Sequence, residues 1–155
     1  MALALVDTNV LVYAHDAADR AKQGRAIDLL SSLADARAGC FSAQVLAEFY
    51  WTVTRGRRPL LTVEEAAEQV DRLCASWPVL AITSRVVTEA TAGARKHMFS
   101  YWDAQIWATA RLNQISIVLS EDFADGSRVG GVRFVNPLRP AFDASSLFAR
   151  RGVTS

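Results

Sequence analysis

The chain has few of the residues that define several protein classes. Its two cysteines, Cys40 and Cys74, are too few for a disulfide framework, form no CxxC pair and have no histidine partner nearby, so both are expected to be buried thiols. Hydrophobic residues make up 51% of the 155 residues, yet no run approaches the roughly 18 apolar residues that a membrane-spanning helix needs. Only two histidines are present, so the chain has few nitrogen or sulfur ligands for a zinc site.

An excess of charge of one sign is also missing. The 17 Lys and Arg residues nearly balance the 16 Asp and Glu residues, so the net charge of +1 provides no global basic field for nucleic acid. The amino-terminal stretch has no basic leader and meets Asp7 after a short apolar run, which is atypical of a signal peptide. The sequence therefore predicts a soluble, cytoplasmic protein that is not bound to a membrane.

Any contact with nucleic acid must then be local, and the best candidate is the loop Arg55–Pro59. Three guanidiniums, those of Arg55, Arg57 and Arg58, cluster there beside residues that favour a turn, and they could bind phosphates. A solvated loop without a ligand explains the same residues equally well. The length fits one domain, which we place at residues 1–138, followed by a C-terminal extension or tail at residues 139–155.

Strand and helix signals alternate along the chain, which is typical of an α/β fold with a mainly parallel sheet covered by helices. Short apolar runs predict strands at residues 2–6, 39–41, 79–82 and 115–119. Apolar spacing and capping residues predict helices at residues 9–14, 19–36, 42–53, 62–75, 84–97 and 100–113. In the second of these helices, the buried face is expected to consist of Ile27, Leu30, Leu33 and Ala34.

Four carboxylates fall where this arrangement brings side chains to one edge of the sheet: Asp7, Glu48, Asp103 and Asp122. Asp7 and Asp122 each follow a short buried strand, and the helices that carry the other two acids begin at the same carboxyl edge. Open α/β proteins place their chemistry at that edge. Because converging carboxylates repel one another, the sequence predicts a divalent cation with oxygen ligands among them.

Each carboxylate also has a purely structural explanation. Asp7 could cap the short helix that follows it, and Asp103 could complete a capping box with Ser100. Glu48 lies in an apolar helical face, where its charge needs an arginine, a hydrogen bond or a metal. All of these explanations must hold at once if the arrangement is an accident, so a common site is the simpler interpretation.

The turn that follows the last predicted strand contains three acids, which makes the fourth position ambiguous. Asp122 is closest to the end of the strand, whereas Asp125 precedes a glycine and could simply shape the turn. Glu121 is expected to face solvent. The sequence leaves open whether Asp122 or Asp125 completes the site.

These segments resemble the PIN-domain ribonucleases, and more narrowly the VapC-type toxins of bacterial toxin-antitoxin pairs. The resemblance spans nearly the whole chain and rests on the order and spacing of Val6–Val12, Ser42–Phe49, Tyr101–Ala104 and Leu119–Asp122. It implies a single-domain α/β/α sandwich in which residues 1–138 form the PIN domain. It also implies a homodimer and a cognate antitoxin protein that covers the active-site groove.

The resemblance further implies a metal-dependent endoribonuclease that uses Mg²⁺ or Mn²⁺. The catalytic carboxylates would be Asp7, Glu48, Asp103 and Asp122. Those that bind the metal directly would be Asp7, Asp103 and Asp122. Polar positions that lie near the metal in this family are matched by Thr8, Asn9 and Ser120.

The expected chemistry follows from the ligands. Neither His15 nor His97 is well placed as a base, so a metal would lower the pKa of its bound water, which then hydrolyses an RNA phosphodiester bond. Two alternatives stay open: a DNA-directed or structure-specific nuclease, and a non-catalytic PIN-like domain that binds RNA or a protein.

By helical spacing, core positions are expected for Trp51, Trp102 and Trp107. Tyr50 and Trp51 could also border a partner groove.

Overall fold

A six-stranded sheet forms the centre of the computed structural model, which describes residues 3–148. The strands are β1 (Ala4–Val6), β2 (Gly39–Ser42), β3 (Val79–Leu80), β4 (Ile117–Leu119), β5 (Arg128–Val129) and β6 (Val132–Val135). They lie in the order β3-β2-β1-β4-β6-β5. Among the described residues, each pairing is parallel except that of β5 with β6, which confirms the mainly parallel sheet predicted from the sequence.

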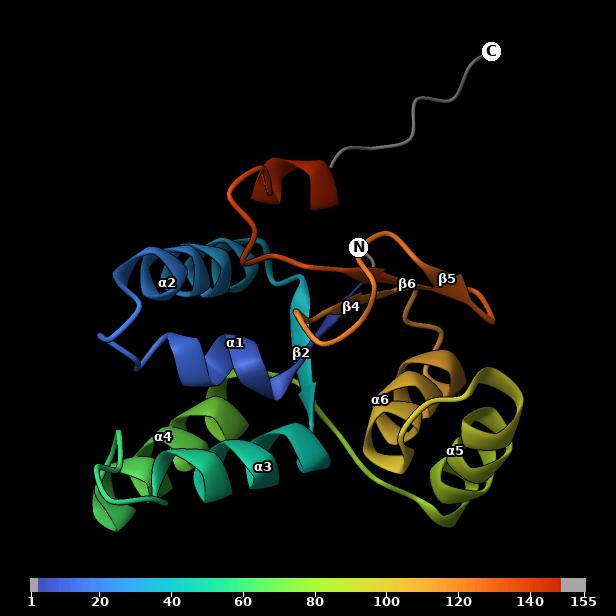
Figure 1. Ribbon diagram of the computed structural model, residues 1–155, viewed down its shortest axis with the longest axis horizontal. Coiled ribbons are helices and arrows are strands. Elements are labelled where there is room, and N and C mark those ends of the chain that lie inside the picture. The colour runs from blue at the N-terminus through green and yellow to red at the C-terminus, as the bar shows by residue number, and fades with distance from the viewer. Residues whose placement is uncertain (1–2, 149–155) are drawn as a thin grey trace.

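Helices cover both faces of this sheet (Figure 1). They are α1 (Thr8–Tyr13), α2 (Arg20–Ala36), α3 (Ala43–Val53), α4 (Val63–Ser76), α5 (Ser84–His97) and α6 (Tyr101–Leu112), and a short 3-10 helix follows at Ala144–Leu147. Successive strand residues face opposite layers, because Val6 packs in the core beneath α1 to α4, whereas Leu5 packs in the core beneath α5 and α6. The chain is therefore the α/β/α sandwich that was expected.

Polar caps fix the helix starts at the carboxyl edge of the sheet. Ser42 ends β2, and its Oγ accepts a hydrogen bond from the Val45 N–H at 3.2 Å, so α3 begins where β2 ends. Ser100 Oγ accepts from the Asp103 N–H at 3.2 Å at the start of α6. Asp7 follows β1 directly and caps α1. The same short-range signals that start these helices therefore bring their first turns to one edge.

The buried face of α2 agrees with the prediction at Leu33 but differs from it at other positions. Ile27 is 48% exposed and Ala34 is exposed, whereas Leu30 is half-buried. The fully buried side chains of this helix are those of Ala26, Leu29 and Leu33. Apolar residues surround much of α2, so spacing alone allows two neighbouring faces, and packing against the rest of the layer selects one of them. The strand predicted at residues 79–82 is also shorter, because β3 ends at Leu80.

Three side chains that were expected in the core lie at the surface. Cys74 of α4 is exposed, and Trp51 and Trp102 are 59% and 60% exposed. Cys40 and Trp107 are buried as predicted, and burial raises the pKa of the Cys40 thiol to about 12. Helical spacing tells which residues share a face, but it does not tell whether another element covers that face.

The segment after β6 returns to the layer formed by α1 to α4. Of the extension predicted at residues 139–155, residues 139–148 are described, and Phe142, Leu147 and Phe148 pack against the core of that layer. Residues 149–155 lie outside the described residues, as do residues 1 and 2, where the first predicted strand begins. Within residues 3–148, none of the helices has both the length and the apolar character needed to cross a membrane.

Candidate active site

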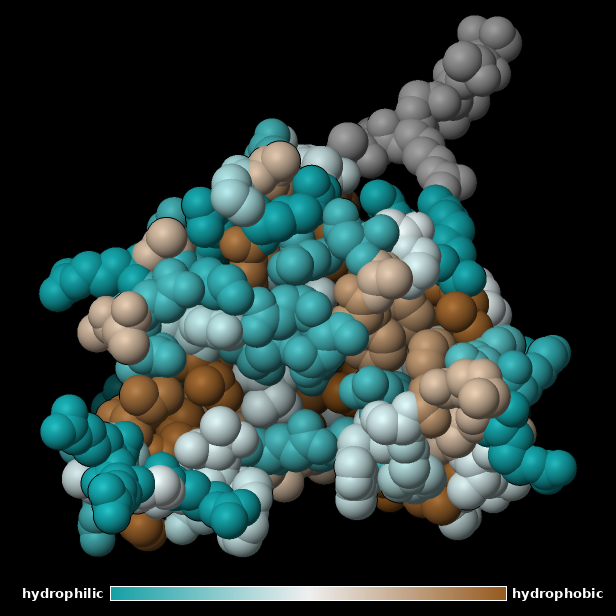
Figure 2. Space-filling view, viewed as in Figure 1, coloured by the Kyte–Doolittle hydropathy of each residue, from teal (hydrophilic) through white to brown (hydrophobic). Residues whose placement is uncertain are grey.

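One open cleft at the carboxyl edge of the sheet is lined by all four predicted carboxylates, those of Asp7, Glu48, Asp103 and Asp122. It has a volume of about 520 Å³ and lies between α1, α3 and α6. Figure 2 shows hydrophilic residues gathered on this face, over α1 and the loop that follows β4. The acids come from four separate segments of the chain, so only the tertiary fold brings them together.

Asp7 is almost completely buried, with 3% of its surface exposed. Its Oδ1 accepts a hydrogen bond from the Thr8 N–H at 2.7 Å, and its Oδ2 accepts one from Ser120 Oγ at 2.6 Å. Burial raises the pKa of Asp7 to about 7, against the effect of these hydrogen bonds, and repulsion by Asp122 and Glu48 adds to the rise. Asp7 is thus both a helix cap and a charge that the cleft disfavours without a nearby cation.

Glu48 lies half-buried on α3 and is held by neutral donors. Thr8 Oγ1 donates to its Oε2 at 3.2 Å, and Gln44 Nε2 donates to its Oε1 at 3.0 Å. Gln44 also donates to the Trp102 carbonyl at 3.1 Å and accepts from Gln105 Nε2 at 2.9 Å, which joins α3 to α6. In the described part of the chain, Glu48 forms no ion pair with an arginine. The sequence reasoning missed both glutamines, although buried amides on apolar helix faces are a usable signal.

Asp103 and Asp122 complete the acidic lining. Burial raises the pKa of Asp103, and the charges of Asp122 and Glu48 raise it further, while its hydrogen bond with Ser100 lowers it. Asp122 is exposed, and its N–H donates to Ser120 Oγ at 3.1 Å. The same serine therefore contacts Asp7 and the backbone of Asp122, and it links the ends of β1 and β4.

Asp125 does not line this cleft. Its Oδ1 accepts from the Asn136 N–H at 2.8 Å, and its Oδ2 lies 3.1 Å from Arg139 Nε. These contacts hold Asp125 against the segment that follows β6. Of the two acids that the sequence left open, the structure brings Asp122 to the other carboxylates and gives Asp125 an arginine partner.

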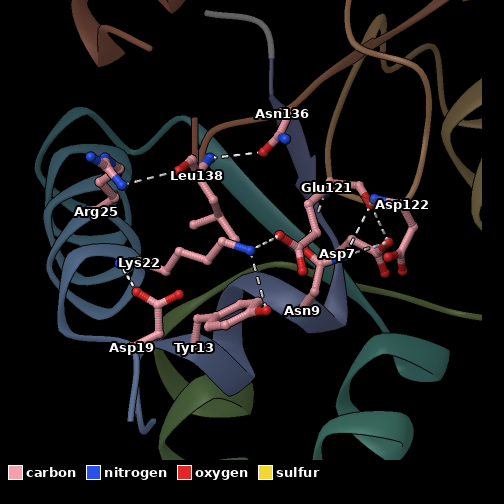
Figure 3. Close-up of polar contacts among 11 residues, drawn as sticks. Asp7, Asn9, Tyr13, Asp19, Lys22, Arg25, Glu121, Asp122, Asn136 and Leu138 are labelled. Carbon is pink, nitrogen blue, oxygen red and sulfur yellow. Dashed lines mark hydrogen bonds and ion pairs between the residues drawn. The ribbon is translucent and has the colours of Figure 1, made fainter. Parts of the chain in front are cut away.

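Glu121 does not face solvent as predicted. Lys22 Nζ of α2 donates to its Oε2 at 2.9 Å and to the Tyr13 hydroxyl at 3.4 Å, and the Glu121 side chain is 20% exposed (Figure 3). The Glu121 N–H also donates to Asn9 Oδ1 at 3.4 Å. These contacts anchor the chain immediately before Asp122. No local pattern could reveal the ion pair, because Lys22 lies far away in sequence.

The oxygen-rich lining fits a hard divalent cation. Within residues 3–148, no three Asp, Glu, His or Cys side chains converge closely enough to form a ready-made metal site. Mg²⁺ needs only one or two direct carboxylates, however, because it keeps several of its own waters. The raised pKa values of Asp7 and Asp103 reflect burial together with repulsion between acids, which a cation would relieve. The chemistry of the donor set therefore agrees with the predicted type of ion.

Neither histidine lines the cleft. His15 packs against Phe49 with 5.6 Å between ring centroids, and burial lowers its pKa. His97 packs edge-on against Trp107 at 5.3 Å. The two imidazoles thus serve packing contacts on opposite layers of the sandwich.

The basic loop after α3 meets the cleft at one point. The Arg55 guanidinium lies 3.9 Å above the centre of the Trp51 ring, and Trp51 lines the acidic cleft. Arg57 and Arg58 are exposed and lie outside the described lining of the cleft. Tyr50, which was expected with Trp51 to border a partner groove, borders a separate groove between α3 and α4.

Comparison with known families places most of this chain in one of them. The family model of the PIN domain matches residues 4–128, which include all four carboxylates of the cleft. No curated protein sequence matches the chain significantly.

Several solved structures share the fold. VapC20 of Mycobacterium tuberculosis, a sarcin-ricin loop cleaving toxin, is 23% identical over 77% of this chain and 89% of its own, with a TM-score of 0.62. A toxin-antitoxin complex from Klebsiella pneumoniae is 18% identical over 86% and 97%, also with a TM-score of 0.62. FitAcB from Neisseria gonorrhoeae is 20% identical over 87% and 98%, with a TM-score of 0.60. At such low identity, these similarities establish a common fold.

Proposed function

This chain belongs to the PIN-domain family, and we propose that it is a metal-dependent endoribonuclease that acts as the toxin of a toxin-antitoxin pair. One observation carries the proposal: four carboxylates from separate segments line a single open cleft at the carboxyl edge of the sheet. A metal-assisted hydrolysis of phosphodiesters is the chemistry that such a set of oxygen ligands supports best. The solved relatives from toxin-antitoxin systems, among them one named for cleaving the sarcin-ricin loop, favour this assignment.

We assign Asp7, Asp103 and Asp122 as the acids that would hold Mg²⁺ or Mn²⁺, one or two of them directly and the rest through waters that the ion keeps. When bound there, the cation supplies Lewis acidity that neutralises charge on the phosphoryl oxygens and acidifies water for the attack. Ser120 holds Asp7 through a 2.6 Å hydrogen bond, which fixes the direction of its remaining lone pairs. Glu48, fixed by two neutral donors, orients the attacking water by accepting its hydrogen bond. Thr8 and Asn9 position the carboxylates of Glu48 and Asp7 by donating hydrogen bonds to them.

We further propose that residues 1–138 form the catalytic domain of a cytoplasmic homodimer and that a cognate antitoxin protein covers the acidic cleft. The toxin-antitoxin complex from Klebsiella pneumoniae, which shares this fold, supports an antitoxin partner. The cleft is open and acidic, so a covering segment would need basic side chains to match it.

The decisive experiment incubates the purified protein with total cellular RNA and with single-stranded DNA, in Mg²⁺, Mn²⁺ or EDTA, and maps new ends by sequencing. Asp7→Asn is the inactivating variant. Asp125→Asn is its matched control, because it makes the same substitution at an acid that lies outside the cleft. We expect metal-dependent cuts in RNA that disappear with EDTA and with Asp7→Asn but persist with Asp125→Asn.

Other outcomes would redirect the proposal. Cuts in DNA alone would make the protein a DNA-directed nuclease with the same ligands. A folded protein that binds RNA in EDTA and cuts neither nucleic acid would be a non-catalytic binding domain.

A further inference from the structure

Two large aromatic side chains stand exposed at the acidic cleft. Trp51 and Trp102 are 59% and 60% exposed, and both line the same cleft as the four carboxylates. Trp51 lies one helical turn after Glu48 on α3, and Trp102 directly precedes Asp103 on α6. Each indole is therefore attached to the helix that also supplies an acid, so the backbone of each tryptophan is held beside that acid.

The surroundings of each indole indicate an anionic partner with flat rings. The Arg55 guanidinium covers the Trp51 ring at 3.9 Å and brings a positive charge to the rim of an otherwise acidic cleft. Trp102 and Tyr101 pack edge to face, with 5.1 Å between ring centroids. Its backbone carbonyl is held by Gln44 at 3.1 Å, so the start of α6 stays fixed to α3. An exposed ring held in place beside a cation suits a phosphate-bearing ligand with aromatic bases.

We propose that Trp51 and Trp102 are stacking platforms for unpaired nucleobases on either side of the phosphate that reaches the carboxylates, with Arg55 contacting a neighbouring phosphate. This inference rests on the nuclease function proposed above and adds the side chains of this chain that hold the substrate on either side of the cleaved bond. Every base has a stackable face, so platforms of this kind tolerate many sequences.

The depth of the acids gives a second reason to exclude a duplex. Asp7 is 3% exposed, so the phosphate must enter the cleft between α1, α3 and α6 to approach it. A single strand can bend its backbone inward and turn its bases onto the tryptophans. In a duplex, the bases are already stacked and paired, and the phosphates follow a rigid surface.

A protein partner is the competing occupant. The two tryptophans also border an adjoining apolar hollow that includes Ala43, Ala47 and Ile82, which would suit side chains of a second copy or another protein. The position of both rings on the acid-lined cleft, together with the cation on Trp51, favours the nucleic acid. The experiment below separates the two occupants.

The test compares Trp51→Ala, Trp51→Phe, Trp102→Ala and Trp102→Phe with Ile27→Ala, which removes an exposed apolar side chain from the outer face of α2. The substrate is an RNA oligonucleotide that contains a mapped cleavage site, offered unpaired and annealed to its complement, with a DNA oligonucleotide of the same sequence as a third arm. Each alanine variant should raise KM for the unpaired RNA about tenfold, because one stacked base is lost. The kcat should change little, the phenylalanine variants should recover most of the loss, and Ile27→Ala should match the wild type.

Binding without cleavage gives an independent readout. In the Asp7→Asn background, the unpaired oligonucleotide should quench indole emission, and the quenching should fall when Trp51 and Trp102 are both phenylalanine. The DNA arm tells whether the platforms accept either backbone. Sedimentation of each variant shows whether a tryptophan instead holds a protein interface.

The outcomes separate this inference from the proposed nuclease function. A wild-type protein that cleaves unpaired RNA while its alanine variants keep the same KM overturns the platforms alone, as does equal cleavage of the annealed duplex. Alanine variants that change the assembly state, with KM altered only through that change, assign the rings to a protein interface and also overturn the proposal. A folded wild-type protein that does not cleave, together with a folded Asp7→Asn variant whose indole emission is not quenched, overturns both.

Discussion

The two sides of the acidic cleft are built in different ways. The strand side consists of Asp7, Asn9, Ser120, Glu121 and Lys22, and it is joined by hydrogen bonds and an ion pair that link β1, α1, α2 and the segment after β4. The helix side carries Glu48 and Asp103, which are half-buried, and the exposed Trp51 and Trp102. The strand side therefore links several chain segments around a buried charge, whereas the helix side also exposes rings that a ligand can contact.

The largest effect should come from removing the buried charge of the strand side. Asp7→Asn keeps the size and the helix cap but loses the anion, so kcat should fall at least about 100-fold, as when a metal site loses essential support. Cleavage of the mapped RNA measures the loss. If Asp7→Asn were no less active than Asp125→Asn, the strand side would not be where the charge is needed.

The next effect should come from the residue that orients Asp7. Ser120→Ala removes the 2.6 Å hydrogen bond to Asp7 and the contact with the Asp122 N–H, so Mn²⁺ affinity should weaken about 10- to 100-fold. Titration calorimetry measures this affinity directly. Trp102→Phe, on the helix side, should leave Mn²⁺ affinity unchanged, and an equal loss in both variants would erase the distinction between the two sides.

The pH dependence of the unfolding free energy should also be caused by the strand side, through the titration of Asp7. The pKa of Asp7 rises from 3.8 to about 7 in the fold without metal, so the folded state prefers the protonated acid. The stability that this preference contributes is fully present below about pH 4 and is lost as the pH rises through about 7.

Asp7→Asn should therefore raise Tm in EDTA at pH 8, by about 2–4 °C for each kcal/mol of repulsion and desolvation that it removes, and should leave Tm nearly unchanged at pH 4. Thermal unfolding at the two pH values measures the difference. Adding Mg²⁺ at pH 8 should stabilise the wild type more than the variant. A variant that is less stable than the wild type at pH 8 in EDTA would contradict the assigned cost of the buried charge.

The smallest effect should come from the ion pair at the outer end of the strand side. Lys22 and Glu121 are 33% and 20% exposed, so a double-mutant cycle of Lys22→Met and Glu121→Gln should give a coupling of about 0.2–1 kcal/mol in unfolding free energy. Each single variant should weaken Mn²⁺ binding about threefold, and the double variant should add little. Fully additive losses would mean that the two residues do not act through one contact.

Much of the fold was predictable because its signals are local. Apolar runs located β1, β2 and β4, and cap residues such as Ser42, Thr62 and Ser100 located the starts of the helices. The positions of Asp7 and Asp122 immediately after strands followed from the same patterns, since the carboxyl ends of parallel strands meet at one edge.

The errors arose where a property depends on distant partners. Glu121 was expected to face solvent. This prediction was wrong because Glu121 forms an ion pair with Lys22, which joins residues from α2 and the end of β4. The face of α2 and the exposure of Trp51 and Trp102 depend on which elements cover each helix. The position of Gln44 on an apolar face of α3 was a usable signal, but its pairing with Gln105 of another helix could not be read from spacing within α3.

By itself, the sequence determined the helix caps, the acids that stand at strand ends, and the order of the helices and of β1 to β4, because these depend on neighbours within a few residues. It did not reveal β5 and β6. Only the tertiary structure decided which acid of the turn enters the cleft, how Asp7 is held, and which aromatic rings stay exposed beside it. The physical reason is that burial, hydrogen-bond partners and electrostatic repulsion depend on distances between side chains, and folding sets those distances independently of separation along the chain.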